Sequence, residues 1–108
     1  MTADDARRLA LALPETTEQD HWGAPSFRIR GHIFATLPPN ETLNVMVDMG
    51  ETKAVVAAEP DIFEELWWGK RLRGVRIKLP RADETVVAEL LDSAWRLKAP
   101  KRLACSAG

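Results

Sequence analysis

The sequence is poor in the features that mark secreted and membrane proteins. It contains a single cysteine, Cys105, so no disulfide can form within the chain, and disulfides belong to oxidising compartments. No stretch approaches the roughly 18 consecutive apolar residues of a membrane-spanning helix. Asp4 and Asp5 stand where a signal peptide would be basic. These absences predict a cytoplasmic protein that makes no contact with membranes.

The sequence also lacks the patterns that carry catalysis. It has no glycine-rich phosphate loop, and Cys105 has no histidine near it in the sequence to act as a base. Glu64 and Glu65 are adjacent, so a regular element turns them to different sides and they cannot work as an acid–base pair. Ser26 lies near His21, but the segment around both residues resembles a packing motif rather than a nucleophile turn. We therefore expect a protein that is not an enzyme and uses no cofactor.

The length of 108 residues fits one domain, with an expected core at about residues 3–100 and a loose tail at 101–108. Apolar residues at helical spacing predict three helices, and a proline follows each of them. These helices are expected at 3–13, 51–58 and 83–97.

Alternation of apolar and polar residues predicts strands at 26–30, 32–37, 43–48 and 75–79. The remaining segments are expected to be a polar connection at 16–20, a basic turn at 69–74 and either a strand or an irregular return at 62–68. The order of these elements predicts an α+β fold, in which an antiparallel sheet of four or five strands has helices packed on one face.

Aromatic side chains are expected to fill most of the core. If residues 67 and 68 lie on a strand, one of the two tryptophans there, Trp67 or Trp68, must face outward. The aromatic residues assigned to the core are Trp22, Phe27, Phe34, Phe63 and Trp95.

Charge is distributed unevenly along a chain whose formal net charge is −1. Residues 51–69 are acidic, whereas residues 70–81 contain six cations and no acid. Such a block is the strongest charge feature of the sequence. Its members are Lys70, Arg71, Arg73, Arg76, Lys78 and Arg81.

Four short motifs follow one another in a fixed order. They are Leu11-Ala12-Leu13-Pro14-Glu15, Trp22-Gly23-Ala24-Pro25-Ser26-Phe27, Gly31-His32-Ile33-Phe34-Ala35, and Ala94-Trp95-Arg96 followed by Ala99-Pro100-Lys101-Arg102-Leu103. Together they resemble the pattern of the MmcQ/YjbR family over about residues 6–103.

This resemblance implies a frataxin-like, or CyaY-like, fold, which is also described as a double-wing arrangement similar to some DNA-binding domains. It implies no established catalytic residues. Residues 62–73 depart from some members of the family, because Trp67-Trp68-Gly69-Lys70-Arg71 replaces an aromatic-Asn-Lys stretch.

Metal binding is not expected either. Frataxin-like proteins bind iron through an acidic surface of the first helix, but here the two aspartates are followed at once by Arg7 and Arg8. His21 and His32 can approach each other, yet zinc and iron sites need three or four converging ligands. No third ligand is indicated.

The leading functional hypothesis is contact with DNA or another polyanion. Arg28 and Arg30 on one strand and Arg76 and Lys78 on another would share an open sheet face, and a tryptophan would stack on a base. The alternative is an ordinary solvated face, on which nearby acidic side chains neutralise these cations. The residues assigned to this surface are Arg28, Arg30, Trp67, Trp68, Lys70, Arg71, Arg73, Arg76 and Lys78.

A rival hypothesis is a protein-interaction or small-ligand-binding module that uses a cleft near His21, Trp22 and His32. The expected partner is DNA, with a protein or a small anion as the alternatives. In both cases we expect a monomer or a weak homodimer.

Overall fold

The computed structural model describes residues 1–103, which form both α-helices and β-strands. The elements are α1 (Ala3–Leu11), β1 (Thr16–His21), β2 (Ala24–Ile29), β3 (His32–Thr36), β4 (Thr42–Val45), α2 (Met49–Ala58), β5 (Phe63–Trp68), β6 (Arg71–Lys78), the short 3₁₀ helix η1 (Leu79–Arg81) and α3 (Glu84–Lys98). Within the described residues, no helix has the length and apolarity needed to cross a lipid bilayer.

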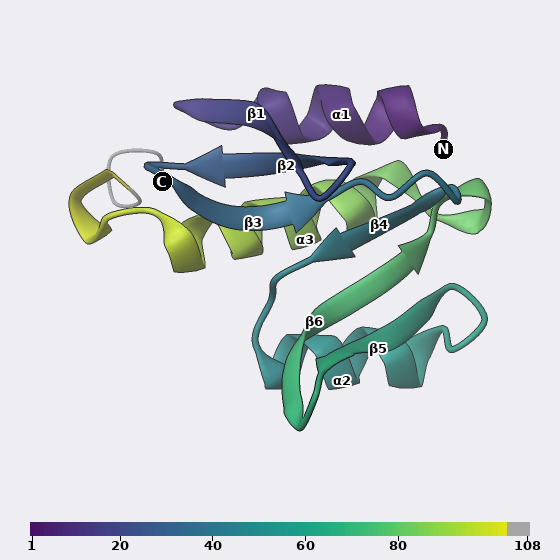
Figure 1. Cartoon of the computed structure of the whole chain (residues 1–108). Helices are drawn as coiled ribbons and strands as arrows, with labels where there is room; N and C mark the ends of the chain where they lie inside the picture. Colours follow the sequence, from purple (N-terminus) through teal and green to yellow (C-terminus); the bar gives the residue numbers. More distant parts are fainter. Residues whose placement is uncertain (104–108) are drawn as a thin grey trace.

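The six strands form one antiparallel sheet in the order β1-β2-β3-β4-β6-β5. Figure 1 shows the three α-helices behind this sheet, so that the face toward the viewer is open. Helix α3 packs against β3 and β4, and α2 packs against β5 and β6. The predicted α+β class, with helices on one face, is confirmed.

The sheet has six strands rather than the four or five that were predicted. The segment taken for a polar connection is β1, which pairs with β2 from Thr16↔Ile29 to His21↔Ala24. It is an edge strand with residues 17–20 all exposed, so it carries no apolar alternation by which a strand is normally detected. The undecided segment near residue 65 is also a strand, β5.

The basic segment expected to be a turn belongs mostly to β6. Trp68 pairs with Arg71, which leaves only Gly69 and Lys70 in the turn, and Gly69 supplies the positive φ of 59°. The third predicted strand, by contrast, ends at Val45. Asp48 caps α2 instead, because its Oδ1 atom accepts a hydrogen bond from the amide of Glu51 at 2.8 Å.

The ends of the chain differ in detail from expectation. Helix α1 ends at Leu11 rather than at residue 13. Residues 101–103 are helical, although a loose tail was expected to begin there. Cys105 lies outside the described residues.

The core lies between the sheet and its helices. Phe27, Phe34, Phe63 and Trp95 are buried as predicted, and the indole nitrogen of Trp95 donates a hydrogen bond to the carbonyl of Pro14 at 3.0 Å. Trp22 was wrongly assigned to the core. Its side chain is 92% exposed because it lies in the turn between β1 and β2, beyond the edge of the packed layers.

The sheet forks between β3 and β4. These strands pair only at Ala35↔Val45 and Thr36↔Asn44, with one further bond from the amide of Met46 to the carbonyl of Phe34 at 2.9 Å. Beyond this junction the two strands diverge (Figure 1). A pocket lies on the open face at this point.

Gly74 lets β6 approach β4 closely beside this junction, because it has no side chain. A Cβ atom at Gly74 would overlap the carbonyl oxygen of Val45 and would lie 3.0 Å from the Cα of Met46. Both obstacles are backbone atoms, so they cannot move aside by a change of rotamer. Only glycine fits at this position.

We expect Gly74→Ala to lower the free energy of unfolding by about 2 kcal/mol or more, because the added methyl group must displace the backbone of β4. Gly50→Ala in α2 is the matched control, since its new Cβ would meet its nearest neighbour, Asp48 Oδ1, at 3.6 Å. That control should be neutral or should stabilise the protein by up to about 1 kcal/mol. Urea denaturation measures both. Equal stabilities of the two variants would contradict the close approach of β4 and β6.

Candidate anion-binding site on the open face of the sheet

A row of polar side chains crosses the open face at one level of the strand register. Ser26 Oγ donates to the carbonyl of Gln19 at 2.7 Å, and Asn44 Nδ2 donates to Thr36 Oγ1 at 3.2 Å. Because these groups satisfy one another, the row offers little free hydrogen-bonding capacity. In register order, the polar row comprises Gln19, Ser26, Thr36, Asn44, Arg76 and Glu64.

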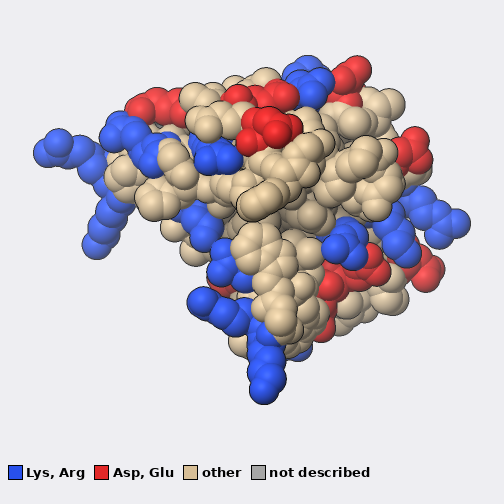
Figure 2. Space-filling view, in the orientation of Figure 1, with Lys and Arg blue, Asp and Glu red and all other residues tan. Residues whose placement is uncertain are grey.

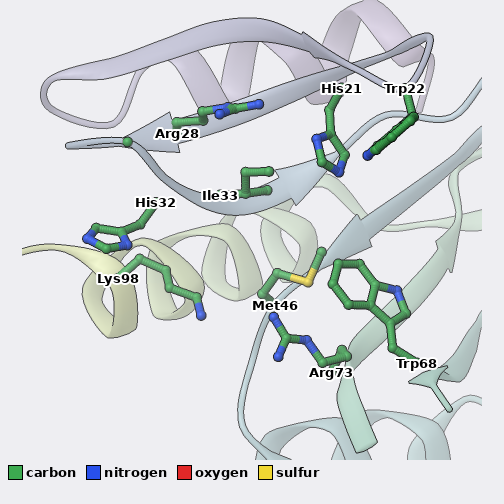
Figure 3. A pocket seen from close by; sticks show the side chains of 10 residues that line it. His21, Trp22, Arg28, His32, Ile33, Met46, Trp68, Arg73 and Lys98 are labelled. Carbon is green, nitrogen blue, oxygen red and sulfur yellow. The ribbon is translucent and has the colours of Figure 1, made fainter.

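A cavity of about 610 Å³ opens beside the polar row, where β3 and β4 diverge. Figure 3 shows side chains from both sides of the fork turned toward it. We call this cavity the fork pocket. Its lining consists of three cations (Arg28, Arg73, Lys98), two imidazoles (His21, His32), two indoles (Trp22, Trp68), the apolar side chains of Ile33 and Met46, and Gly31.

Two β-bulges shape the walls of the fork pocket. On β3, the register passes from Phe27↔Ala35 to Arg28↔Ile33, so Phe34 is the extra residue. On β6, the register passes from Leu66↔Gly74 to Trp67↔Leu72, so Arg73 is the extra residue. A bulge bends its strand and redirects side chains, and bulges are common beside functional sites.

The cations of the fork pocket are not neutralised. No carboxylate lines the pocket, and none of Arg28, Arg73 and Lys98 forms an ion pair within the described part of the chain. Arg28 donates its Nε hydrogen to Ser26 Oγ at 3.1 Å. The guanidinium carbon of Arg73 lies 4.7 Å from the ring centroid of Trp68, which is a cation–π contact.

Trp22 stands at the rim on a two-residue hairpin turn. Its φ is 55° and that of Gly23 is 85°, so both central residues of the turn are in the left-handed region. The ring of Trp22 makes an edge contact with His21, with their centroids 6.1 Å apart. The turn therefore projects an almost fully exposed indole over the open face.

The fork pocket combines parts of both predicted sites. Arg28, Trp68 and Arg73, assigned to a polyanion surface, lie beside His21, Trp22 and His32, assigned to a separate cleft. Although the two histidines share the pocket, no group of three or more His, Cys, Asp or Glu side chains able to hold a metal ion occurs among residues 1–103.

Other predicted site residues lie elsewhere or have partners. Arg30 forms two hydrogen bonds with the carboxylate of Glu15, at 2.8 and 3.2 Å. Arg76 bonds to Glu64 at 3.3 Å, and the Trp67 indole donates to Glu65 at 3.1 Å. The three remaining residues are exposed and do not line the pocket; they are Lys70, Arg71 and Lys78.

The sequence reasoning missed four residues of the fork pocket. Lys98 comes from the end of α3, far along the chain from the other cations, and Gly31, Ile33 and Met46 were assigned to neither predicted site. Nothing in the local pattern marks them, because only the divergence of β3 from β4 brings them to one cavity.

Charge is unevenly distributed over the open face. Figure 2 shows one group of Lys and Arg side chains on the left and another at the lower end of this face, whereas at the top and on the right Lys and Arg lie beside Asp and Glu. Two acids on the margins are tied to partners. A hydrogen bond from Arg30 lowers the pKa of Glu15, and hydrogen bonds from Trp67 and then Lys53 lower the pKa of Glu65.

The fold and the site together define an α+β domain with one sheet face covered by helices and the other open, with a cationic pocket at its fork. The model of the YjbR family matches residues 11–97, so the chain belongs to the YjbR family. The resemblance carried by the four sequence motifs is thereby confirmed.

A solved structure shares this fold. The crystal structure of the Deinococcus radiodurans protein DR2400, described as a DUF419 domain, superimposes with a TM-score of 0.76 at 19% sequence identity. The match covers 89% of this chain and 77% of that protein. No curated protein matches the chain.

The pairing of Arg30 with Glu15 predicts a titration that can be measured. Because the hydrogen bond lowers the pKa of Glu15 in the folded state, it contributes stability above the ordinary pKa of the carboxyl group. That contribution is lost as the pH falls through the lowered value. In Arg30→Ala, the pKa of Glu15 should rise toward its ordinary value in an NMR titration of the side-chain carboxyl carbon. Arg28→Ala should leave it unchanged. If the pKa of Glu15 is the same in Arg30→Ala as in the unaltered protein, the bond between Arg30 and Glu15 is contradicted, and Arg30 counts among the unpaired cations.

Proposed function

We propose that this YjbR-family domain is a binding module that contacts nucleic acid at the fork pocket. One observation carries the proposal: three cations without an ion pair and two exposed indoles surround a cavity that no carboxylate of residues 1–103 lines. Proteins that bind nucleic acid combine cations for the phosphates with aromatic rings for the bases.

The cations suit phosphate groups in both chemistry and position. Arg28 uses its Nε atom to hold Ser26, which fixes the side chain while its terminal nitrogens stay available. A guanidinium donates two parallel hydrogen bonds to a phosphate, and Lys98 adds a compact charge from the helix side of the fork. A concave site of one charge sign also concentrates the field that attracts an anion.

The proposed role is binding rather than catalysis. The hydroxyl of Ser26 contacts one of these groups, but Ser26 is buried, and its Oγ atom donates to a backbone carbonyl and accepts from Arg28. It is therefore held by two partners and not presented as a nucleophile. The groups that line the cavity supply hydrogen-bond donors and ring faces, and we assign no cofactor to them.

A small soluble anion that carries an aromatic ring is a second candidate. The cavity volume of about 610 Å³ falls within the roughly 300–1,000 Å³ of small-molecule sites. The two candidates differ in their response to salt. A polymer that releases several counterions binds with a steep dependence on salt concentration, whereas a ligand held mainly by ring contacts depends on it weakly.

We expect Arg28→Gln and Arg73→Gln each to weaken the binding of an oligonucleotide and to lower the slope of log affinity against log salt concentration by about 1. Arg30→Gln is the matched control, because Arg30 is held by Glu15 outside the pocket, and its slope should stay close to that of the unaltered protein. Fluorescence anisotropy at several salt concentrations measures these slopes, and circular dichroism verifies that each variant is folded.

Absence of oligonucleotide binding at low salt would overturn the proposal. The same holds if all three arginine variants lower the slope equally, because binding would then reflect general surface charge rather than the fork pocket.

A further inference from the structure

We infer that the fork pocket takes an unpaired nucleotide, so that the domain selects single-stranded over double-stranded nucleic acid. This inference rests on the proposed function and adds the form of the ligand. The observation behind it is the arrangement of the pocket, with the two indoles at one end, where Arg73 lies over the ring of Trp68, and Lys98 and His32 at the other end (Figure 3).

Trp22 lies at a position where its side chain does not stabilise the fold. Its side chain is 92% exposed, so it contributes almost no burial to the core. Its φ of 55° is unfavourable for a bulky side chain, and a turn with positive φ at both central residues is best served by Asn-Gly. A residue that is strained and exposed at the rim of a pocket is explained by what the pocket binds.

Trp68 supplies a second ring surface. It is 53% exposed, and the guanidinium of Arg73 lies over its ring at 4.7 Å from the centroid. This contact restrains the ring and brings a positive charge to its edge of the pocket. Arginine and tryptophan together form a platform on which a base can stack.

The opposite end of the fork pocket is cationic. Figure 3 shows His32 and Lys98 at the end away from the two indoles, and Arg28 between this end and His21. Arg73 lies beside Trp68. A nucleotide has the same division, with a flat ring at one end and a phosphate at the other. The pocket therefore matches one nucleotide unit, with the base toward Trp22 and Trp68 and the phosphate toward Arg28 and Lys98.

A base within a duplex cannot use this arrangement. Both of its faces are stacked on neighbouring bases and its hydrogen-bonding edge is paired, so entry into a cavity requires the base to be unstacked and flipped at a cost of a few kcal/mol. An unpaired base pays little of this cost. Cations alone would bind both forms, and it is the ring contacts that separate them.

The test compares three probes on the full chain: a fluorescent oligothymidine of about 12 nucleotides, a duplex of the same length, and inorganic polyphosphate as a competitor without bases. We expect the single strand to bind at least about tenfold more tightly than the duplex. Polyphosphate should compete poorly with the single strand and effectively with the duplex, because only the single strand uses the rings.

Trp22→Asn is the decisive variant. Asparagine fits the left-handed turn better than tryptophan does, so the variant should keep or raise the melting temperature. It should nevertheless weaken single-strand binding by about tenfold, the loss of one stacked base, and change duplex binding less than twofold. A merely structural role for Trp22 predicts the reverse, with lower stability and unchanged binding.

Trp67→Ala is the matched control. Trp67 is 49% exposed and lies next to Trp68, but it does not line the pocket, and its indole is bonded to Glu65. It should leave the affinities for both nucleic acids unchanged. If Trp67→Ala and Trp22→Asn weaken binding equally, the fork pocket is not the stacking site and the inference is wrong.

The outcomes separate the inference from the proposed function. If the duplex binds as tightly as the single strand while Arg28→Gln weakens both, nucleic-acid contact stands and selection for an unpaired base is overturned. If none of the nucleic acids binds at low salt, both fail.

Discussion

The short junction between β3 and β4 is the constraint on which the rest of the structure depends. Two residue pairs and one further backbone bond at Met46 join one half of the sheet, β1–β3, to the other half, β4, β6 and β5. A longer ladder would flatten the sheet and close the fork. The missing side chain of Gly74 lets β6 lie close to β4 at this level, where the second half meets the first. The pocket is the space that the divergence leaves, and α3 closes it from behind with Lys98.

The same junction divides the open face into two chemically different regions. Where the six strands are in register, polar side chains lie next to one another and satisfy each other, as Asn44 does with Thr36 and Arg76 does with Glu64. Beside the fork, Arg28 lies opposite Thr17 and Ile33, and Arg73 is the extra residue of a bulge, so neither cation faces a carboxylate across the strands. The unpaired charge at this point therefore follows from the residues that lie opposite Arg28 and from the bulge at Arg73.

The sequence predicted the parts of this structure that depend on local pattern. Apolar alternation located β2, β3, β4 and β6, helical spacing located the three helices, and the four aromatic side chains with neighbours on a buried face were assigned correctly to the core. Strand β1 was missed because an edge strand with exposed residues on both faces has no apolar period to detect. Trp22 was misassigned because the size of an aromatic side chain is a guide to burial only on an element that has a covered side.

The candidate site was less predictable, for a reason of geometry. Alternation correctly predicted that Arg28 and Arg76 face the open side, but it carries no information on partners across strands. Those partners distinguish the available Arg28 from the paired Arg76. Arg73 reaches the pocket only through a bulge, which shifts the register by one residue, and Lys98 comes from a different element altogether. Such convergence depends on tertiary contacts, and the residue pattern of a single segment does not predict which other segments it will contact.

The net charge of −1 is compatible with an anion site because the acids lie in other places. Arginines of helix α1 form ion pairs with several of these acids. Examples are Arg7 with Glu18 at 3.0 Å and Arg8 with Glu84, and both pairs lie away from the fork pocket. Exposed charges are screened over about 8 Å at physiological salt, whereas the molecule measures 35 × 29 × 27 Å, so acids on the helix side scarcely affect a ligand on the open face. A near-neutral domain also exerts little long-range attraction on a polyanion. The binding that we propose must therefore draw its energy from contacts made inside the pocket, where ring stacking would depend little on salt and would add to each phosphate contact. On such a surface the indoles, more than the total number of cations, would decide which anion is held.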